Sequence, residues 1–232
     1  MDKRDQILTS HETKYINPNP FQLQHPFRAV SCGSSGSGKT YSILKNILMD
    51  PKMPFHKVVW VAPEFSLQQP KLQEMKKLLG KRLEFVNGLD EERLKEIIEN
   101  KPQKEQMLIV LDDLLTKTDS PLIKDLFISG RHKNISTIEI LQQVYAGKSG
   151  RSHRLNCDYF ILHNFPDRSE AKRLFQQLEP SNYHNLMKAY ETCIQKSNGK
   201  GFLMIDNKFH DKQSGANLLR YRANALDHVI EL

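Results

Sequence analysis

Eight consecutive residues decide the fold of this chain: Gly33-Ser34-Ser35-Gly36-Ser37-Gly38-Lys39-Thr40. They match the pattern G-x-x-x-x-G-K-[ST] in full. Residues 27–32 before them form a short apolar run, and residues 39–49 carry apolar side chains at helical spacing. A glycine-rich turn between a strand and a helix can aim successive backbone N–H groups at an anion, and the helix adds its positive end. The stretch therefore predicts a phosphate-binding loop, called here the phosphate loop (residues 33–40).

Each residue type in the phosphate loop suits contact with a nucleotide. We expect the residues from Gly33 to Thr40, together with Tyr41, to bind the nucleotide. Lys39 is expected to pair with the β- and γ-phosphates, and the hydroxyl of Thr40 to ligate Mg²⁺. The predicted ligands are therefore a nucleoside triphosphate and Mg²⁺.

Two acidic residues follow a second apolar run. Asp112 and Asp113 come directly after the continuously apolar residues 107–111, a pattern typical of a strand buried on both faces of a parallel sheet. Ligands of such sheets bind at the carboxyl ends of the strands. We expect Asp112 to join Thr40 at the Mg²⁺ site, and Asp113 to orient or deprotonate the water that attacks the γ-phosphate.

Strand-like and helix-like segments alternate along the rest of the chain. The expected strands span 27–32, 57–62, 83–86, 107–111, 135–141, 159–162, 202–205 and 218–222. The expected helices span 39–49, 67–79, 90–99, 121–129, 168–178 and 181–195. This order predicts an α/β three-layer sandwich with a mostly parallel central sheet. Because residues 57–62 lie between the two motifs in the sequence, we expect an additional strand between the phosphate-loop strand and the carboxylate strand, as in hydrolysis-driven motors.

Composition predicts one domain inside a cell. With 232 residues and a formal net charge of +7, the chain suits an N-terminal arm over 1–26, where Pro-containing dipeptides disfavour helix, and a single domain over 27–232. The longest apolar runs are far shorter than a membrane span, and the charged N-terminus lacks a secretory signal. Three unevenly spaced cysteines indicate free thiols. The positive charge is compatible with a phosphate-rich partner.

The middle of the chain adds a more specific pattern. The segment Ser129-Gly130-Arg131-His132-Lys133-Asn134-Ile135-Ser136-Thr137-Ile138, with Gln142-Gln143 after it, resembles the third motif region of DNA packaging ATPases of the poxvirus type, within the FtsK/HerA class. The likeness runs from residue 27 to 166. It implies a RecA-like motor that hydrolyses ATP to drive double-stranded DNA into a capsid. It further implies a ring of five or six subunits, a capsid vertex or portal partner, and a place in the infected cell (nucleus or cytoplasmic virus factory) or the virion.

The resemblance also suggests roles for single residues. Gln142 resembles the polar sensor that touches the γ-phosphate or the attacking water, and an amide at the end of a neighbouring strand can do both. Ring motors complete each site with an arginine from the next subunit. Arg131 is the first candidate because it follows helix 121–129, which we expect on the carboxyl side of the sheet; Arg151 and Arg154 are the second. Lys148, Arg151 and Arg154 are candidates for sequence-independent contact with DNA phosphates.

Other functions are compatible with parts of the pattern. A nucleoside or small-molecule kinase also has a phosphate loop and a similar length, although the Asp112-Asp113 pair and Gln142 argue against it. A cellular-type DNA-pumping ATPase is the nearest variant of the packaging motor. An ATP-dependent switch or assembly scaffold with slow turnover fits as well. Residue 113 is Asp where many motors of the class carry Glu, which leaves the identity of the base open.

Overall fold

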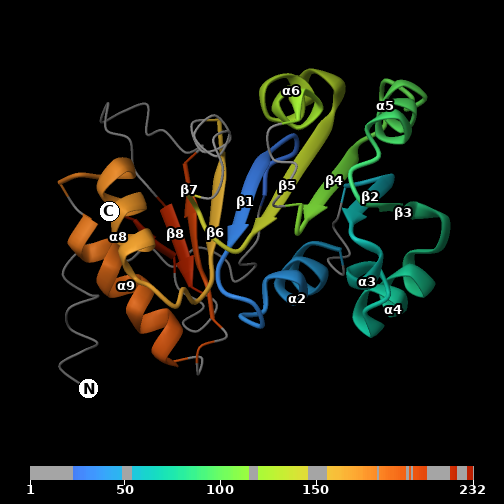
Figure 1. The fold of residues 1–232 in the computed structure, drawn as a ribbon. Coiled ribbons are helices and arrows are strands. Elements are labelled where there is room, and N and C mark those ends of the chain that lie inside the picture. Colours follow the sequence, from blue (N-terminus) through green and yellow to red (C-terminus); the bar gives the residue numbers. More distant parts are fainter. Residues whose placement is uncertain are drawn as a thin grey trace.

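The computed structural model describes residues 23–48, 54–114, 120–145, 156–181, 183–196, 199, 201–207, 220–223 and 229–231. Within them, nine strands form one sheet in the order β3-β2-β4-β5-β1-β6-β7-β8-β9 (Figure 1). The strands are β1 (Arg28–Cys32), β2 (Lys57–Ala62), β3 (Leu83–Asn87), β4 (Met107–Asp112), β5 (Ile135–Leu141), β6 (Tyr159–Leu162), β7 (Leu203–Asp206), β8 (Arg220–Ala223) and β9 (Val229–Glu231). Strands β1 to β6 pair in parallel, and β7 to β9 extend the sheet antiparallel.

Helices cover both faces of the sheet. The described helices are α2 (Lys39–Ile43), α3 (Glu64–Leu67), α4 (Pro70–Leu79), α5 (Glu91–Glu99), α6 (Pro121–Ser129), α8 (Ser169–Leu178) and α9 (Tyr183–Lys196). The short helical turns are η1 (Leu44–Leu48), η2 (Gly80–Arg82) and η3 (Gly130–Lys133). Apolar side chains of α5, α6, α8 and α9 pack in one core cluster, and those of α2, η1 and α4 pack in another. The fold is therefore the predicted three-layer sandwich.

The alternation of side chains along each strand produces these two cores. In β4 all six residues are buried, with Ile109 and Leu111 in the α5/α6 core and Leu108 and Val110 in the α2/α4 core. Successive strand residues point to opposite faces, so a strand covered on both sides must be apolar throughout. Asp112 ends this strand on the side of Val110, which is the α2 side of the sheet.

The strand that separates the two motifs differs from the expected one. The structure places β5 between β1 and β4, and puts β2 on the outer side of β4. The prediction that another strand lies between the motifs is confirmed, but the choice of residues 57–62 was wrong. The order of the segments in the sequence led to this error. Strand β5 follows both motifs in the chain, yet it pairs in parallel with β1 on one side and with β4 on the other.

Two expected helices also differ in detail. The segment 67–79 is interrupted, with α3 ending at Leu67 and α4 starting at Pro70. Proline has no N–H to donate, and its fixed φ suits the first turn of a helix, so Pro70 begins a helix and does not continue one. The expected helix 39–49 is α2 followed by the π-helical turn η1.

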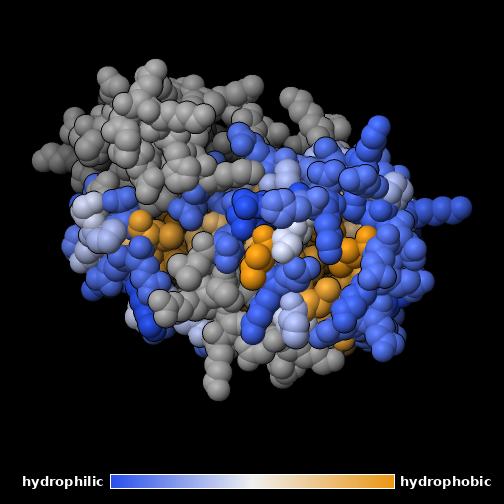
Figure 2. Space-filling view, turned by 90° about the horizontal axis from the view of Figure 1, so that it is seen from above, coloured by the Kyte–Doolittle hydropathy of each residue, from blue (hydrophilic) through white to orange (hydrophobic). Residues whose placement is uncertain are grey.

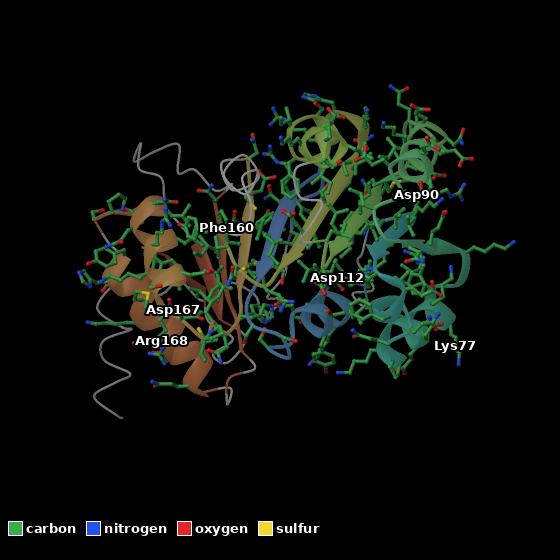
Figure 3. All side chains as sticks on the ribbon, viewed as in Figure 1. Lys77, Asp90, Asp112, Phe160, Asp167 and Arg168 are labelled. Carbon is green, nitrogen blue, oxygen red and sulfur yellow. The ribbon has the colours of Figure 1, made fainter. Side chains whose placement is uncertain are left out.

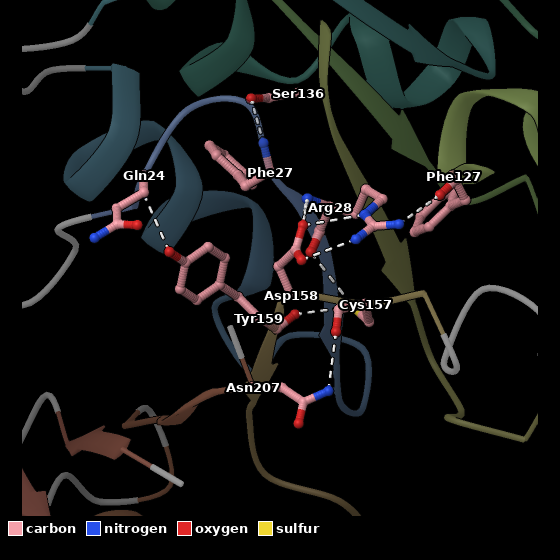
Figure 4. A network of polar contacts seen from close by, with 9 residues as sticks. All are labelled: Gln24, Phe27, Arg28, Phe127, Ser136, Cys157, Asp158, Tyr159 and Asn207. Atoms are coloured by element: carbon pink, nitrogen blue, oxygen red, sulfur yellow. Dashed lines mark hydrogen bonds and ion pairs between the residues drawn. The ribbon is translucent and has the colours of Figure 1, made fainter. Parts of the chain in front are cut away.

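A polar network fixes the start of β1 (Figure 4). The guanidinium of Arg28 donates from Nε and one terminal nitrogen to the carboxylate of Asp158, at 3.1 and 2.9 Å, and from the other to the carbonyl of Phe127 at 3.0 Å. Both charged side chains are only 13% exposed. The bidentate pair therefore joins β1 to the start of β6 and to helix α6, which positions the strand that leads into the phosphate loop.

Two expectations drawn from the sequence, on the cysteines and on membrane spans, can be compared with the described residues. Cys32, Cys157 and Cys193 are free and buried, as expected, and burial raises the thiol pKa of Cys32 and Cys157. No described helix is both long and apolar enough to cross a membrane. The expected arm lies mostly outside the described residues, which begin at Leu23.

Candidate nucleotide site

The phosphate loop, the two acids and Gln142 meet at one edge of the sheet. A cavity of about 350 Å³ is lined by the phosphate loop, by Asp112 at the end of β4 and Asp113 after it, and by Gln142 after β5. Figure 3 shows Asp112 at the end of β4 beside α2. Because these strands are parallel, their carboxyl ends meet at the same edge. Residues that lie far apart in the sequence are thereby brought into one site.

Backbone hydrogen bonds hold the phosphate loop between two strands. The N–H of Gly33 donates to the carbonyl of Leu141, the last residue of β5, at 3.2 Å. The N–H and the hydroxyl of Ser34 both donate to the carbonyl of Asn164, after β6, at 2.9 Å. Gly38 caps α2 with a φ of 96°, a conformation that glycine adopts without steric cost. The loop is thus fixed before any phosphate arrives.

Gly33 is required by the close approach of His163. A Cβ atom at Gly33 would lie 2.7 Å from the Cβ of His163, which is shorter than real contacts between such atoms. His163 is completely buried, and its Nε2 lies 3.2 Å from the hydroxyl of Ser42 in α2. Burial lowers the pKa of His163 to about 3, and the nearby charge of Lys39 acts in the same direction. His163 is therefore a neutral support that joins β6 to the loop and its helix.

Lys39 is folded against its own loop. Its ammonium donates to the carbonyls of Gly33 and Ser34, each at 2.7 Å. Burial lowers the pKa of Lys39, while the carboxylates of Asp112 and Asp113 act to raise it. The ammonium therefore lies within the phosphate loop, where we expect the phosphates to bind, and near the two acids.

Asp112 has the surroundings of a metal-binding carboxylate. Its side chain is only 8% exposed, and burial raises its pKa to about 6, with repulsion from Asp113 adding to the effect. The polar hydrogens of Trp60 and Thr40 and the charge of Lys39 lower that pKa. Carboxylate and hydroxyl oxygens side by side are ligands that suit Mg²⁺. Among the described residues, no group of three or more His, Cys, Asp or Glu side chains could hold a metal ion.

Asp113 and Gln142 contact each other across two strands. The amide nitrogen of Gln142 donates to an oxygen of Asp113 at 3.5 Å, a long hydrogen bond. Asp113 has a φ of 55°, in the left-handed region that non-glycine residues seldom adopt. This turn directs its carboxylate away from the path of β4 and toward the end of β5. A carboxylate and an amide are thus available to bind one water molecule between them.

Aromatic and cationic side chains form the rim of the cavity. Tyr41 is 49% exposed and lies with its ring 4.5 Å from the ammonium of Lys71 in α4. Phe65, in the short helix α3, is 70% exposed and lines the same cavity. The nucleotide-binding role predicted for Tyr41 is compatible with this position and stays a prediction.

Arg131 lies at the opposite edge of the sheet from the cavity. It belongs to η3, which leads into the amino end of β5, beside α6 in Figure 1. The expectation that it follows α6 on the carboxyl side was wrong, because β5 runs parallel to β1 and so begins at the other edge. Figure 2 views the molecule from that side, and among its coloured residues hydrophilic ones surround smaller hydrophobic areas. Arg131 is exposed and is no part of the site in its own subunit.

The predicted DNA-contact residues cannot be placed, and two residues beside the cavity were not predicted. Lys148, Arg151 and Arg154 lie in 146–155, outside the described residues. Sequence reasoning overlooked His163 and Trp60. A polar residue directly after the apolar strand 159–162 was the available signal for His163, whereas for Trp60 the sequence offers only a strand-like pattern.

Solved structures with a similar fold include viral packaging proteins. The genome packaging NTPase B204 from Sulfolobus turreted icosahedral virus 2, in complex with ATP-gammaS, is 15% identical with a TM-score of 0.56, covering 90% of this chain and 97% of that one. Its complex with AMPPCP is 14% identical with a TM-score of 0.57, covering 89% and 97%. B204, the DNA-packaging ATPase from Sulfolobus turreted icosahedral virus, is 14% identical with a TM-score of 0.56, covering 87% and 98%.

These matches confirm the predicted fold class. No curated protein sequence matches the chain. The family model described as Poxvirus A32 protein matches residues 19–213, which include every described part of the site. This match confirms the resemblance that the third motif region indicated, and because it takes in most of the sequence, the chain belongs to the poxvirus A32 protein family.

Proposed function

We propose that this chain is an ATP-hydrolysing motor that drives double-stranded DNA into a viral capsid and works as a ring of identical subunits. One observation carries the proposal: the phosphate loop, two carboxylates and Gln142 line a single cavity. Membership of the poxvirus A32 family supports a viral function. The packaging NTPases of similar fold support DNA as the transported substrate and ATP as the nucleotide.

The loop and its lysine bind the phosphates. Backbone N–H groups at the start of α2 face the phosphate oxygens, and Lys39 exchanges the carbonyls of Gly33 and Ser34 for the β- and γ-phosphates. Thr40 and Asp112 fit Mg²⁺ by their oxygen donors and their proximity. When bound, Mg²⁺ supplies positive charge that neutralises the phosphates.

Asp113 and Gln142 prepare the attacking water. Asp113 accepts a proton from the water, and Gln142 holds the carboxylate through its amide nitrogen while its amide oxygen remains free to accept a hydrogen bond. Protein groups so fixed in advance spend little free energy on reorganisation during the reaction. The long contact of 3.5 Å leaves space for it to tighten around bound substrate.

Arg131 acts on the neighbouring subunit. In a head-to-tail ring, different surfaces of adjacent subunits meet, so the amino edge of one sheet can face the carboxyl edge of the next. Arg131 is exposed at that amino edge. A guanidinium delivered in this way stabilises the charge on the transferred phosphoryl group and ties hydrolysis to ring assembly.

The partners follow from the motor function. Lys148, Arg151 and Arg154 supply phosphate contacts that read no base sequence, as translocation requires. We propose a ring of five or six subunits that docks on a capsid vertex or portal protein in the infected cell, at the nucleus or a cytoplasmic virus factory.

The test measures phosphate release with and without long double-stranded DNA. We expect DNA to stimulate hydrolysis, and Lys39→Ala to abolish it because the γ-phosphate loses its cation. Lys77→Ala is the matched control, since Lys77 is exposed on α4 away from the cavity. Phosphate transfer to a nucleoside, with no effect of DNA, would indicate a kinase and contradict the proposal.

Mixed rings test the arginine. Arg131→Ala should bind ATP normally and hydrolyse it slowly, whereas Lys133→Ala in the same turn should behave as wild type because its exposed ion pair with Asp125 contributes little. Mixing Arg131→Ala with Lys39→Ala subunits should restore part of the activity. The Arg131→Ala subunit keeps an intact nucleotide site, and a neighbouring Lys39→Ala subunit supplies that site with an intact arginine. Absence of restoration in mixtures shown to co-assemble would remove Arg131 from the mechanism.

A further inference from the structure

Trp60 lies on the strand next to Asp112, on the same face of the sheet. In the parallel pairing of β2 with β4, Trp60 is opposite Val110. Both belong to the α2/α4 core. Because strand side chains alternate, Asp112 points to that face too, one pleat farther toward the cavity. A side chain as long as tryptophan reaches such a diagonal neighbour.

The indole N–H of Trp60 is buried next to this carboxylate. Trp60 is completely buried, and among the described residues no acceptor lies within ordinary hydrogen-bond geometry of its Nε1. Burial raises the pKa of the Asp112 carboxyl, and the indole N–H of Trp60 acts to lower it. The two groups therefore lie close together. A buried N–H without an acceptor is unfavourable, and tryptophan usually finds a partner for it. The Asp112 carboxylate is the acceptor that the geometry offers.

The geometry points to Trp60 as a positioning residue that holds one oxygen of the Asp112 carboxylate, so that the other oxygen faces Thr40 and the metal. Phenylalanine or leucine could fill the same apolar space, so the packing alone does not require an indole. The hydrogen of Nε1 is what tryptophan adds. This inference rests on the proposed role of Asp112 as a Mg²⁺ ligand.

Loss of the indole N–H should weaken the response to Mg²⁺ specifically. A carboxylate that can rotate must be ordered again when the metal binds. We expect the Mg²⁺ concentration for half-maximal tight binding of a fluorescent ATP analogue to rise roughly five- to tenfold, the loss expected for one hydrogen bond to a fixed group. Affinity for the same analogue without Mg²⁺ should stay within about twofold, because the phosphate loop is unchanged.

Two replacements separate the N–H from the bulk of the side chain. Trp60→Phe removes the N–H and part of the ring, and incorporation of benzothienylalanine at position 60 replaces only the N–H by sulfur. Phe160→Leu is the packing control, since Phe160 is equally buried on β6 but lies in the other core cluster. It should lower the melting temperature without changing the Mg²⁺ dependence. If Trp60→Phe does not fold, the benzothienylalanine protein decides the question.

A second readout uses the fact that Trp60 is the one tryptophan of the chain. Adding Mg²⁺ to the complex of the protein with the non-hydrolysable analogue AMPPCP should change the intrinsic fluorescence of Trp60. Asp112→Asn should abolish that change. An unaltered Mg²⁺ dependence in the benzothienylalanine protein, together with a strong effect of Asp112→Asn, would overturn the positioning role alone. An unaltered Mg²⁺ dependence in Asp112→Asn would overturn the proposed metal ligand and this inference together.

Discussion

The buried imidazole of His163 makes a quantitative prediction about pH. Its pKa is about 3 in the folded protein, against an ordinary value of 6.5, because burial and the charge of Lys39 disfavour the protonated form. A group whose folded pKa is depressed stabilises the protein above the unfolded pKa, and that stability is lost as pH falls toward the folded pKa. The loss should begin near pH 6.5 and continue toward pH 3.

The size of the effect follows from proton uptake by the unfolded chain. Between pH 7 and pH 5.5 the unfolded imidazole becomes protonated while the folded one does not, which lowers the free energy of unfolding by about 1.3 kcal/mol. Over the whole window the contribution reaches about 5 kcal/mol. His163→Gln keeps a polar side chain near Ser42 but cannot titrate in this range, so this part of the pH dependence should disappear.

The assay is reversible urea unfolding at both pH values, followed by circular dichroism. We expect the wild type to lose about 1.3 kcal/mol more than His163→Gln on going from pH 7 to pH 5.5. His184→Gln is the matched control, since the same exchange there replaces an imidazole exposed on α9 and not a buried one. Equal slopes for wild type and His163→Gln would refute the reasoning, because His163 would then titrate in the folded state.

Four further predictions concern the site itself. Gly33→Ala should lower the free energy of unfolding by about 1–3 kcal/mol, because its methyl group meets the Cβ of His163; thermal melts measure this, and an unchanged melting temperature would contradict the close approach. Asp113→Asn should slow hydrolysis about 10²- to 10⁴-fold with nucleotide affinity nearly unchanged, and full single-turnover activity would exclude it as the base. Gln142→Ala should act in the same direction but more weakly, measured by the same assay. Lys39→Ala should weaken nucleotide binding in equilibrium titrations, and wild-type affinity would argue against the assigned phosphate contact.

The residues of the phosphate loop and the two acids could be predicted because their chemistry is local. A glycine-rich turn before Lys39 and a carboxylate pair after a buried strand carry their meaning within a few residues of sequence. The position of Gln142 at the end of a strand next to the phosphate loop was also predicted, and the structure places it in contact with Asp113. Its role as a sensor stays a prediction. Here the resemblance to packaging ATPases added to the local pattern.

Strand order and chain direction could not be obtained in this way. The insertion of β5 between β1 and β4 depends on parallel pairing between distant segments, which no local pattern encodes. The edge assigned to Arg131 was wrong for the same reason, because the direction of β5 decides it. The proximity of Trp60 to Asp112 depends on the register of two strands that are separated by α3, α4, β3 and α5.

The position of β5 gives the subunit a direct mechanical link between its two edges. All seven of its residues are buried, and it is hydrogen-bonded on both sides, to β1 and to β4. Such a strand is a stiff rod of about 23 Å. The turn containing Arg131 lies at one end of the rod and Gln142 at the other. If the proposed head-to-tail ring forms, a force on the arginine of one subunit would be transmitted along this single strand to Gln142 of the same subunit, and so from one proposed site to the next.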